Sequence, residues 1–353
     1  MKQSVYIVTE DMSPPLDEGI KNFAHSLLQA WPSEIPVRGL SVLPGRRVDS
    51  SRIASLRVNR LFLSYRLWEE LRSYKPNLIC YVPSASATLF SFIRSRLLKL
   101  YQPRARVVMI SLQPRRYGWF SRHLIRFLAP DVVFVQRKET AKQLIALGCY
   151  VQLIPSGVDL AKFTPVSPER KAELRTQYGL EPETYTVLHV GHINRERNVQ
   201  SLVHIRQKLD AQVILVGSTF PGQDEHLQAE LREQGITIFN QYLPNVEHIY
   251  QLADCYVFPV ISEQACIGAP LSVLEAMACN LPVVTLRYGD LPTAFEDGDG
   301  LFYAEGLSEV PEIVAHIMRA NGCNTREMVA PYSWQNVARL LLGQSELDDK
   351  GKW

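Results

Sequence analysis

Hydrophobic residues in the first half of the chain gather in short runs that alternate with stretches of helical spacing. The runs are almost continuously apolar and rich in β-branched residues, and they lie at 4–10, 77–82, 105–111, 131–136 and 151–157. Such runs are typical of strands buried on both faces of a parallel sheet. Residues 19–31 and 137–148 repeat apolar positions at helical spacing, and the second stretch ends at Gly148 as at a helix C-cap. The pattern predicts a parallel sheet covered by helices.

The same alternation restarts after a turn-rich segment at 163–169. Its apolar runs lie at 185–191, 211–217, 235–240, 255–260 and 281–286. A chain of 353 residues exceeds the usual size of one hydrophobic core. We therefore expect an α/β protein with two Rossmann-like domains, followed by a C-terminal helix that crosses back to the N-terminal domain and a tail. The expected bounds are 1–165, 166–325 and 326–353.

Composition fits an ordinary globular protein, with 46% hydrophobic and 21% charged residues. No apolar run approaches the roughly 18 residues that a membrane-spanning helix needs. The first residues do not resemble a secretory leader, so we expect a cytoplasmic protein. The six cysteines are scattered without a CxxC motif, which favours free thiols and no metal site.

Charge is distributed unevenly. Residues 71–130 contain eleven Lys and Arg but no Asp or Glu, although the whole chain carries only +2. This excess predicts an anionic partner. No nucleic-acid motif accompanies the charge, so we do not expect nucleic acid as the partner.

Residues 115–128 form one candidate surface for such a partner. Helical spacing puts Phe120, Leu124, Phe127 and Leu128 on one face, and the basic residues of the stretch are Arg115, Arg116, Arg122 and Arg126. The apolar face can pack on the sheet, which we favour. It can also lie on an anionic membrane, with the arginines facing the headgroups.

Loops that follow the strands are the expected place for a ligand, because open parallel sheets bind at the carboxyl ends of their strands. Gly19 begins the first helix after the first strand, where a glycine lets backbone amides approach a phosphate. Gly191, His192 and Arg197 follow the strand at 185–191 and can pair with a diphosphate. The plainer alternatives are a tight turn and a solvated basic turn.

Two further loops supply candidate contacts. Tyr242 and Leu243 follow a strand, where backbone groups can pair with a nucleobase edge. Around the start of another helix, free amides for an anion are expected near Gly268, Leu271 and Ser272. Glu275, one turn later, can accept hydrogen bonds from sugar hydroxyls, or can act only as a helix-dipole partner.

Several segments agree in order and spacing with one known family. They are "LIPSGVDLAKFTP", "VLHVGHINRERNVQSLV", "LADCYVFPVIS", "PLSVLEAMACNLPVV" and "YSWQNVARLLL". From about residue 131 to 340 the chain resembles the family-four retaining glycosyltransferases. The resemblance implies the GT-B fold, in which two Rossmann-like domains face each other across a deep cleft. It also implies an N-terminal acceptor domain and a C-terminal domain that binds the nucleotide sugar.

The resemblance assigns roles to individual residues. Glu275 matches the glutamate that binds the ribose of the donor, and Arg197 matches the basic residue that neutralises the diphosphate. Gly19 takes the place of the glycine-rich loop near the phosphates. The implied reaction moves a sugar to an acceptor hydroxyl with retention, and the departing diphosphate helps to deprotonate that hydroxyl. It requires no metal ion or cofactor. We expect a glycan or lipid-linked acceptor, cell-surface polysaccharide or glycolipid synthesis, and a location that can extend to the inner face of the membrane.

Departures from the family pattern leave alternatives open. His192 stands where the family has Arg, and Ile267 stands where it has a second glutamate, a role that Glu263 can take over. Pro270 removes one amide from the expected anion site. A degenerate partner subunit that binds a sugar nucleotide without turnover is therefore the main alternative. A different GT-B chemistry, such as epimerisation or phosphorolysis, is a more distant one.

Overall fold

The computed structural model describes residues 4–16, 18–42, 51–217, 224–320 and 322–343. The expected tail at 344–353 lies outside these residues. The chain forms two compact units. The first comprises Met1–Gly157, Cys266–Ala269 and Trp334–Trp353, and the second comprises Val158–Ala265 and Pro270–Ser333. The main division thus falls between Gly157 and Val158, a little before the expected boundary at 165.

The first unit is built on a seven-stranded parallel sheet of order β3-β2-β1-β4-β5-β6-β7. Its strands are β1 (Val5–Thr9), β2 (Val37–Ser41), β3 (Ile53–Ser55), β4 (Leu78–Tyr81), β5 (Arg106–Ser111), β6 (Val132–Val135) and β7 (Val151–Leu153). β1 lies between β2 and β4, with Val5 opposite Val37 and Leu78. Five of these strands coincide with the predicted runs. β2 and β3, at one edge of the sheet, were not predicted.

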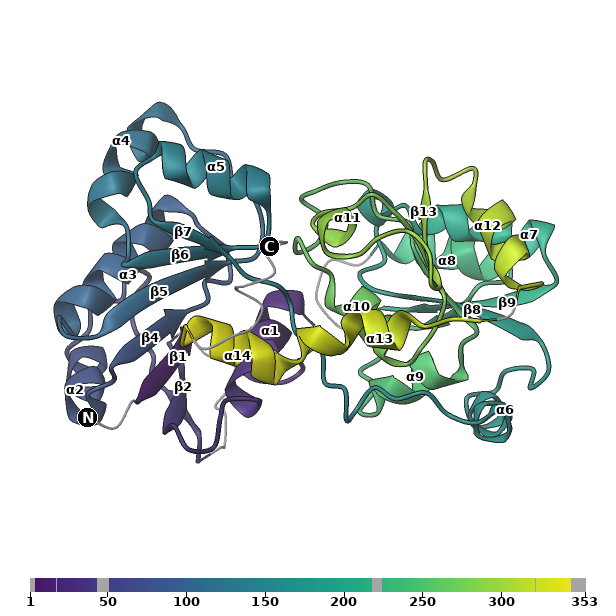
Figure 1. The fold of residues 1–353 in the computed structure, drawn as a ribbon, viewed down its shortest axis with the longest axis horizontal. Helices are drawn as coiled ribbons and strands as arrows, with labels where there is room; N and C mark the ends of the chain where they lie inside the picture. Colours follow the sequence, from purple (N-terminus) through teal and green to yellow (C-terminus); the bar gives the residue numbers. More distant parts are fainter. Residues whose placement is uncertain (1–3, 17, 43–50, 218–223, 321, 344–353) are drawn as a thin grey trace. The chain divides into compact units, whose positions relative to one another are not determined.

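Helices cover both faces of this sheet (Figure 1). They are α1 (Gly19–Gln29), α2 (Tyr65–Tyr74), α3 (Leu89–Tyr101), α4 (Trp119–Leu128), α5 (Lys138–Ala146) and α14 (Trp334–Leu341). Side chains of α2 to α5 share one core cluster with the sheet, whereas α1 contacts α14 and β1. Ser64 and Thr88 cap the first turns of α2 and α3 through backbone amides. Gly148, just past α5, has φ +84°, as its predicted C-cap role requires.

The structure departs in part from the favoured interpretation of α4, because Leu128 packs against the core cluster but Phe120 and Phe127 do not. Ile125 is the buried residue of this helix, while Trp119, Phe120 and Phe127 are 63–75% exposed. The helix is rotated so that Ile125 enters the core and the aromatic side chains face outward. Spacing alone could not fix this rotation, because apolar residues occupy more than half of the helix circumference.

The second unit has a six-stranded parallel sheet of order β10-β9-β8-β11-β12-β13. Its strands are β8 (Tyr185–Val190), β9 (Ala211–Val216), β10 (Thr237–Phe239), β11 (Cys255–Phe258), β12 (Val283–Leu286) and β13 (Leu301–Ala304). All but β13 were predicted. Both sheets are therefore Rossmann-like, as the alternating pattern indicated.

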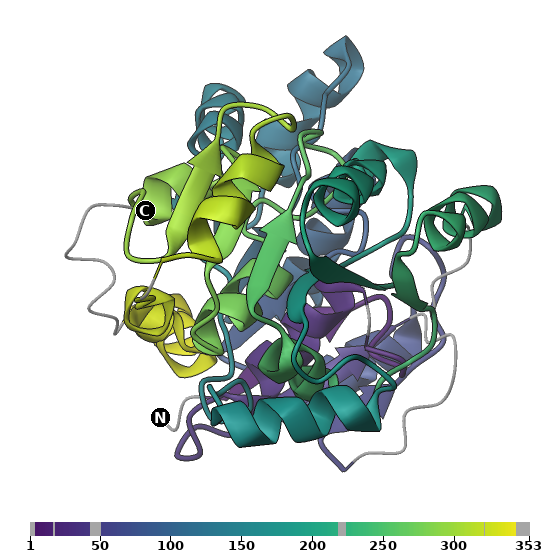
Figure 2. The same ribbon diagram turned by 90° about the vertical axis from the view of Figure 1, so that its right-hand side faces the viewer.

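Helices also cover both faces of the second sheet, as Figures 1 and 2 show. The helical segments are α6 (Pro168–Gln177), η1 (Arg195–Arg197), η2 (Val199–Ser201), α7 (Leu202–Lys208), α8 (Glu225–Glu233), α9 (Val246–Leu252), α10 (Leu271–Ala278), α11 (Leu291–Ala294), α12 (Val310–Ile317), α13 (Thr325–Val329) and η3 (Ala330–Tyr332). Residues of α7, α8 and α12 share one core cluster with the sheet, and α9 and α10 contact β8 and β11. Within the described ranges, no helix has the length and apolar character needed to cross a bilayer.

Candidate functional site

The loop after β8 is held in a defined conformation by two asparagines. Asn194 Oδ1 accepts a hydrogen bond from the Arg197 amide (3.1 Å), which starts the short helix η1. Asn198 has φ +55° and donates from Nδ2 to the Pro259 carbonyl (3.1 Å). The loop is thereby tied to the carboxyl end of β11, so residues from neighbouring strand ends meet at one edge of the sheet.

Arg197 is a buried cation in this loop, with 6% of the residue exposed. Its guanidinium donates to the Ala265 carbonyl (3.0 Å), while Nε has no hydrogen-bond partner among the described residues. No carboxylate of the described chain forms a salt bridge with it. A buried charge without a counter-charge is costly, so the site favours an anion supplied by a ligand.

Gly191 is required by the position of this guanidinium. A Cβ atom built on Gly191 would collide with Arg197 Nη1 and lie 3.2 Å from His189 Nε2. Any larger residue would therefore push Arg197 out of place. The structure thus brings Gly191 and Arg197 together. From the sequence, Gly191 was expected instead to let the backbone approach the ligand.

His189 is a neighbour of this pair that the sequence reasoning missed. The residue is fully buried on β8, and its Nδ1 donates to the Val257 carbonyl (2.8 Å). Burial lowers the pKa of His189 to about 4, and the nearby charge of Arg197 acts in the same direction. The imidazole is therefore neutral near pH 7. His189 occupies an ordinary strand position in the sequence, so only its proximity to Gly191 in the structure identifies it as a candidate site residue.

Glu275 stands on α10, which begins at Leu271 with Pro270 as its N-cap residue. Its Oε2 accepts a hydrogen bond from the Tyr250 hydroxyl (2.7 Å) on α9. Burial raises the pKa of the Glu275 carboxyl, against the lowering effects of the Tyr250 hydrogen bond and the Lys162 charge. Leu271 is buried and Ser272 is partly exposed in the first turn. Tyr250 is a second residue that the sequence reasoning missed.

The remaining candidates of the second unit lie on separate loops. His192 is half-buried directly after Gly191, and Glu263 is exposed in the loop after β11. Tyr242 is 50% exposed and Leu243 is partly buried, both between β10 and α9. Arg197 is linked through Ala265 to the loop that carries Glu263. Within the described chain, no hydrogen bond or salt bridge joins Arg197 to Glu275.

Gly19 and Gly268 belong to the first unit. Gly268 donates its amide to the Leu112 carbonyl (2.9 Å), and a Cβ there would lie 3.0 Å from the side chains of Gln136 and Arg137. Gly19 begins α1 and faces Ile267. These two glycines therefore border the same segment, 266–269, and the amide of Gly268 is already engaged with the protein.

Gln136 anchors that segment through a buried side chain. Its Oε1 accepts from the Ala269 amide (3.0 Å), and its Nε2 donates to Ser156 Oγ (2.8 Å). Ser156 in turn donates to the Ala269 carbonyl (2.7 Å). The sequence reasoning treated Gln136 only as the end of a strand.

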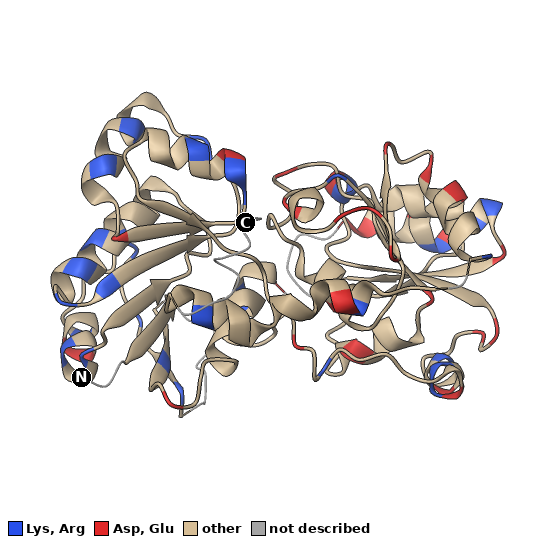
Figure 3. Cartoon of the chain, in the orientation of Figure 1, with Lys and Arg blue, Asp and Glu red and all other residues tan. Residues whose placement is uncertain are grey.

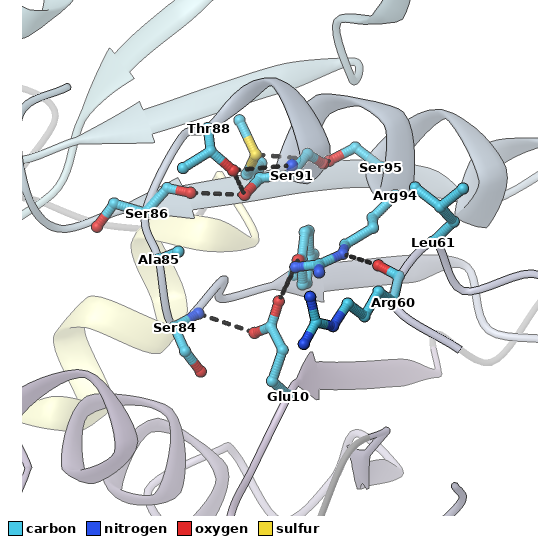
Figure 4. Close-up of polar contacts among 12 residues, drawn as sticks. Glu10, Arg60, Leu61, Ser84, Ala85, Ser86, Thr88, Ser91, Arg94 and Ser95 are labelled. Atoms are coloured by element: carbon cyan, nitrogen blue, oxygen red, sulfur yellow. Dashed lines mark hydrogen bonds and ion pairs between the residues drawn. The ribbon is translucent and has the colours of Figure 1, made fainter. Parts of the chain in front are cut away.

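A second polar network lies at the carboxyl ends of β1 and β4 (Figure 4). Glu10 accepts hydrogen bonds from the Ser84 amide (2.8 Å), Arg94 (2.5 Å) and the Tyr81 hydroxyl (2.6 Å). Arg94 also donates to the Arg60 carbonyl (2.7 Å). These protein groups already supply several partners to each charge, so the network serves chiefly to brace the strand ends.

The basic residues of 115–128 project from the first unit, where Lys and Arg predominate on α3 and α4 (Figure 3). Arg116, Arg122 and Arg126 are exposed and Arg115 is partly exposed. Arg115 donates to the Ala85 carbonyl (2.9 Å), and Arg122 donates to the Tyr117 carbonyl (3.2 Å). The surface therefore joins cations to the exposed aromatic residues of α4.

A groove in the second unit and the potential metal-ligating side chains add no candidate site. A groove of about 620 Å³ in the second unit is lined in part by Lys171, Arg175 and Asp254, whose charges pair with one another. None of the predicted site residues lines it. Among the described side chains, no group of three or more His, Cys, Asp or Glu is placed to hold a metal ion. No disulfide joins the described cysteines, and Cys266 and Cys323 are only partly buried.

Two Rossmann-like units with polar loops at the carboxyl ends of their strands define the GT-B class, and solved structures confirm this fold. Sucrose-phosphate synthase from Thermosynechococcus elongatus superimposes with a TM-score of 0.75 at 19% identity, over 99% of this chain and 98% of that one. HepE of Anabaena in complex with UDP-glucose superimposes with a TM-score of 0.71 at 14% identity, over 96% of this chain and 98% of that one.

The second unit carries most of the sequence similarity to known proteins. Residues 184–320 match the family described as glycosyl transferases group 1. D-inositol 3-phosphate glycosyltransferase of Corynebacterium jeikeium is 30% identical over 239 residues, which are 60% of this chain and 56% of that protein. Sulfoquinovosyl transferase SQD2 of Arabidopsis thaliana is 30% identical over 256 residues, 68% of this chain and 48% of that protein. The aligned part spans about half the length of these relatives. The chain is therefore similar to the group 1 glycosyltransferases and has the GT-B fold, as its motifs predicted.

Proposed function

We propose that this protein transfers a sugar from a nucleotide-sugar donor to an acceptor hydroxyl with retention of configuration. One observation carries the proposal: Arg197 is a buried guanidinium that lacks a carboxylate partner among the described residues. A diphosphate supplies the missing negative charge, and Arg binds such groups through paired hydrogen bonds.

The donor side of the reaction follows from the second unit. Arg197 stabilises the negative charge that grows on the diphosphate as the glycosidic bond breaks. His192 is the neighbouring candidate contact, and Glu275 accepts hydrogen bonds from donor hydroxyls. The donor diphosphate itself takes up the proton of the acceptor hydroxyl. HepE was solved with UDP-glucose, which makes uridine nucleotides the first donors to examine.

The acceptor side of the proposal rests on the charge of the first unit. The eleven basic residues between 71 and 130 favour an anionic acceptor or one carried by an anionic lipid. One relative is named for a phosphorylated inositol and another for a sulfonated sugar, so negatively charged substrates occur among similar proteins. A lipid-carried acceptor would place the reaction in glycolipid or cell-surface polysaccharide synthesis.

Membrane contact is the second part of the proposal. Exposed Trp119, Phe120 and Phe127 on α4 can enter the interfacial region of a bilayer, while Arg122 and Arg126 meet anionic headgroups. This would hold the protein on the inner face of the membrane, beside a lipid-linked acceptor.

Titration calorimetry against a panel of nucleoside diphosphates and nucleotide sugars tests the donor site. We expect one base to bind selectively, and Arg197→Gln to lower diphosphate affinity by about tenfold or more, because hydrogen bonds to charged groups contribute about 1.5–3 kcal/mol. Arg195→Gln is the matched control. This residue is two positions away, more than half exposed and paired with Glu230, so its loss should change affinity less than about twofold.

The outcomes separate the alternatives. If the wild-type protein binds no nucleotide, the donor-site proposal is wrong. If it binds a nucleotide sugar but transfers sugar neither to lipid extracts nor to water, it is a non-catalytic partner subunit. Release of sugar with retained configuration onto an acceptor would establish the proposed reaction.

A further inference from the structure

His189 and Arg197 each bring an unsatisfied nitrogen to the space beside Gly191. His189 Nε2 and Arg197 Nε are both buried without a hydrogen-bond partner among the described residues. A Cβ atom built on Gly191 would lie 3.2 Å from His189 Nε2 and 3.5 Å from Arg197 Cζ. His189 Nε2 and the Arg197 guanidinium, whose Cζ is bonded to Nε, thus border one small space, from which any larger residue at position 191 is excluded.

Their chemistry is complementary. A backbone carbonyl can only accept, so the contact with Val257 requires a proton on His189 Nδ1. The neutral ring then carries a bare lone pair on Nε2, which is an acceptor. Arg197 Nε always carries a proton and is a donor. A buried donor and a buried acceptor on neighbouring side chains, each without a partner, leave two hydrogen-bonding groups unsatisfied in the unliganded protein.

We propose that His189 is a positioning residue for the diphosphate site, and that its Nε2 receives a hydrogen bond from Arg197 Nε when a diphosphate draws the guanidinium into its bound orientation. This inference rests on the proposed function, because it needs a diphosphate ligand at Arg197. It also assigns a role to His189, which fixes the orientation in which Arg197 presents its two terminal nitrogens to the diphosphate.

The choice of a neutral acceptor suits this task. A carboxylate at position 189 would neutralise Arg197 and compete with the ligand, while a cation would repel it. A hydrocarbon ring would leave Nε without an acceptor. The packing around His189 supports a fixed ring: its plane stacks at 24° against Tyr256 with centroids 6.2 Å apart, and Phe258 lies on the same cluster.

Titration calorimetry with inorganic pyrophosphate, a nucleoside diphosphate and the matching nucleoside tests the proposal. His189→Phe keeps the ring but removes both nitrogens. We expect a fivefold to tenfold loss of affinity for pyrophosphate and for the nucleoside diphosphate, with less than a twofold change for the nucleoside. His189→Gln, whose amide oxygen can reach the position of Nε2, should restore part of the loss, whereas His189→Asn should not.

Val187→Ala is the control for packing. Val187 lies two residues earlier on β8, on the same face of the strand, and is buried in the hydrophobic core. The Val187→Ala variant should lower thermal stability without selectively lowering the affinity for pyrophosphate. An equal loss for nucleoside and pyrophosphate in His189→Phe, or a selective loss in Val187→Ala, would overturn the positioning role.

Nitrogen NMR of the wild-type histidines gives a second readout that needs no variant to fold. His189 Nε2 should show the resonance of a bare imine nitrogen, and saturating pyrophosphate should move it toward the hydrogen-bonded range. An unmoved resonance with pyrophosphate bound would exclude the proposed hydrogen bond. Failure of the wild-type protein to bind any diphosphate would instead refute the proposed function, and this inference with it.

Discussion

Glu275 is a carboxylate placed where burial raises its pKa. The folded protein therefore holds the Glu275 proton up to a higher pH than the unfolded chain does. Between the two pKa values the folded state binds more protons, so the free energy of unfolding falls as pH rises through that interval. Above it, the ionised group costs stability, and its contact with Tyr250 offsets only part of that cost. A group retained under these conditions is expected to serve a ligand.

Glu275→Gln should therefore separate stability from binding. The amide oxygen can still accept from Tyr250, but the charge is gone, so the variant should gain stability over the wild type as pH rises from 5 to 8. Nucleotide-sugar affinity should fall by about tenfold or more, since hydrogen bonds from donor hydroxyls to a charged acceptor are lost. Urea denaturation at both pH values and titration calorimetry measure the two effects. Unchanged affinity would remove Glu275 from the donor site.

Tyr250→Phe is the companion to that variant. It removes the 2.7 Å hydrogen bond without removing the charge, so it should lower the free energy of unfolding at pH 8 by about 1–3 kcal/mol. Glu275→Gln should thus raise the free energy of unfolding at pH 8 and Tyr250→Phe should lower it, as the raised pKa of Glu275 and its hydrogen bond to Tyr250 require.

At the residue scale, the sequence pointed to candidate residues in the loops and helices that follow strands. It missed the residues that contact those candidates from other elements. Gly191, Arg197 and Glu275 could be proposed as site residues because their positions relative to strands and helices are informative. His189 and Tyr250 act through side chains that meet partners from other elements. Hydrophobic periodicity predicts only that both residues belong to the core. The unsatisfied nitrogen of His189 and the hydrogen bond of Tyr250 to Glu275 depend on tertiary packing.

At the element scale, α4 shows how the rotation of a helix decides its function. Ile125 turns toward the core, which leaves the aromatic residues and arginines outward. Arg126 lies over the Phe127 ring, 4.4 Å from its centroid, so cation and aromatic form one surface. An amphipathic helix of this kind binds anionic interfaces through both charge and apolar area.

Binding to vesicles that contain anionic lipid tests α4. Arg122→Glu with Arg126→Glu should reduce binding by well over tenfold, because each basic residue near the surface contributes about 1 kcal/mol. Trp119→Ser with Phe127→Ser should reduce binding by removing apolar contact, and this loss should persist at high salt, where the arginine effect is screened.

The matched control is Arg206→Glu with Arg319→Glu, which makes the same change in net charge on exposed positions of the second unit. It should leave vesicle binding within about twofold of wild type. Equal losses from the two charge reversals would show that only net charge matters and that α4 is not a specific surface.

The strands that the sequence missed lie at or next to the edge of a sheet, although the edge strands β7 and β10 were predicted. β3 and β13 are edge strands of three and four residues, and β2 includes an exposed residue, Arg38, followed by a buried glycine, Gly39. Central strands are apolar on both faces, whereas short or partly exposed strands lack a continuous run. The fold class did not depend on the missed strands, because the buried centres already specified parallel sheets.

At the scale of the whole molecule, neither unit is one continuous stretch of chain. Helix α14 comes after the second unit in sequence but belongs to the first. Trp334 packs edge-on against Phe23 of α1, with ring centroids 5.0 Å apart, and lies against Gly157, where a Cβ would approach the indole within 2.5 Å. The stability of the first unit therefore depends on residues at the far end of the sequence.

Trp334→Ala tests this dependence. Trp334 is 5% exposed, so its truncation should lower the free energy of unfolding of the first unit by about 3–5 kcal/mol. Hydrogen exchange should show faster exchange at β1 and β4, with β8 and β11 unchanged. Phe302→Ala, which shortens a partly buried aromatic residue of β13, is the control and should show the reverse pattern. If Trp334→Ala accelerated exchange at β8 and β11 as much as at β1 and β4, the two units would unfold as one, and α14 would not be specific to the first.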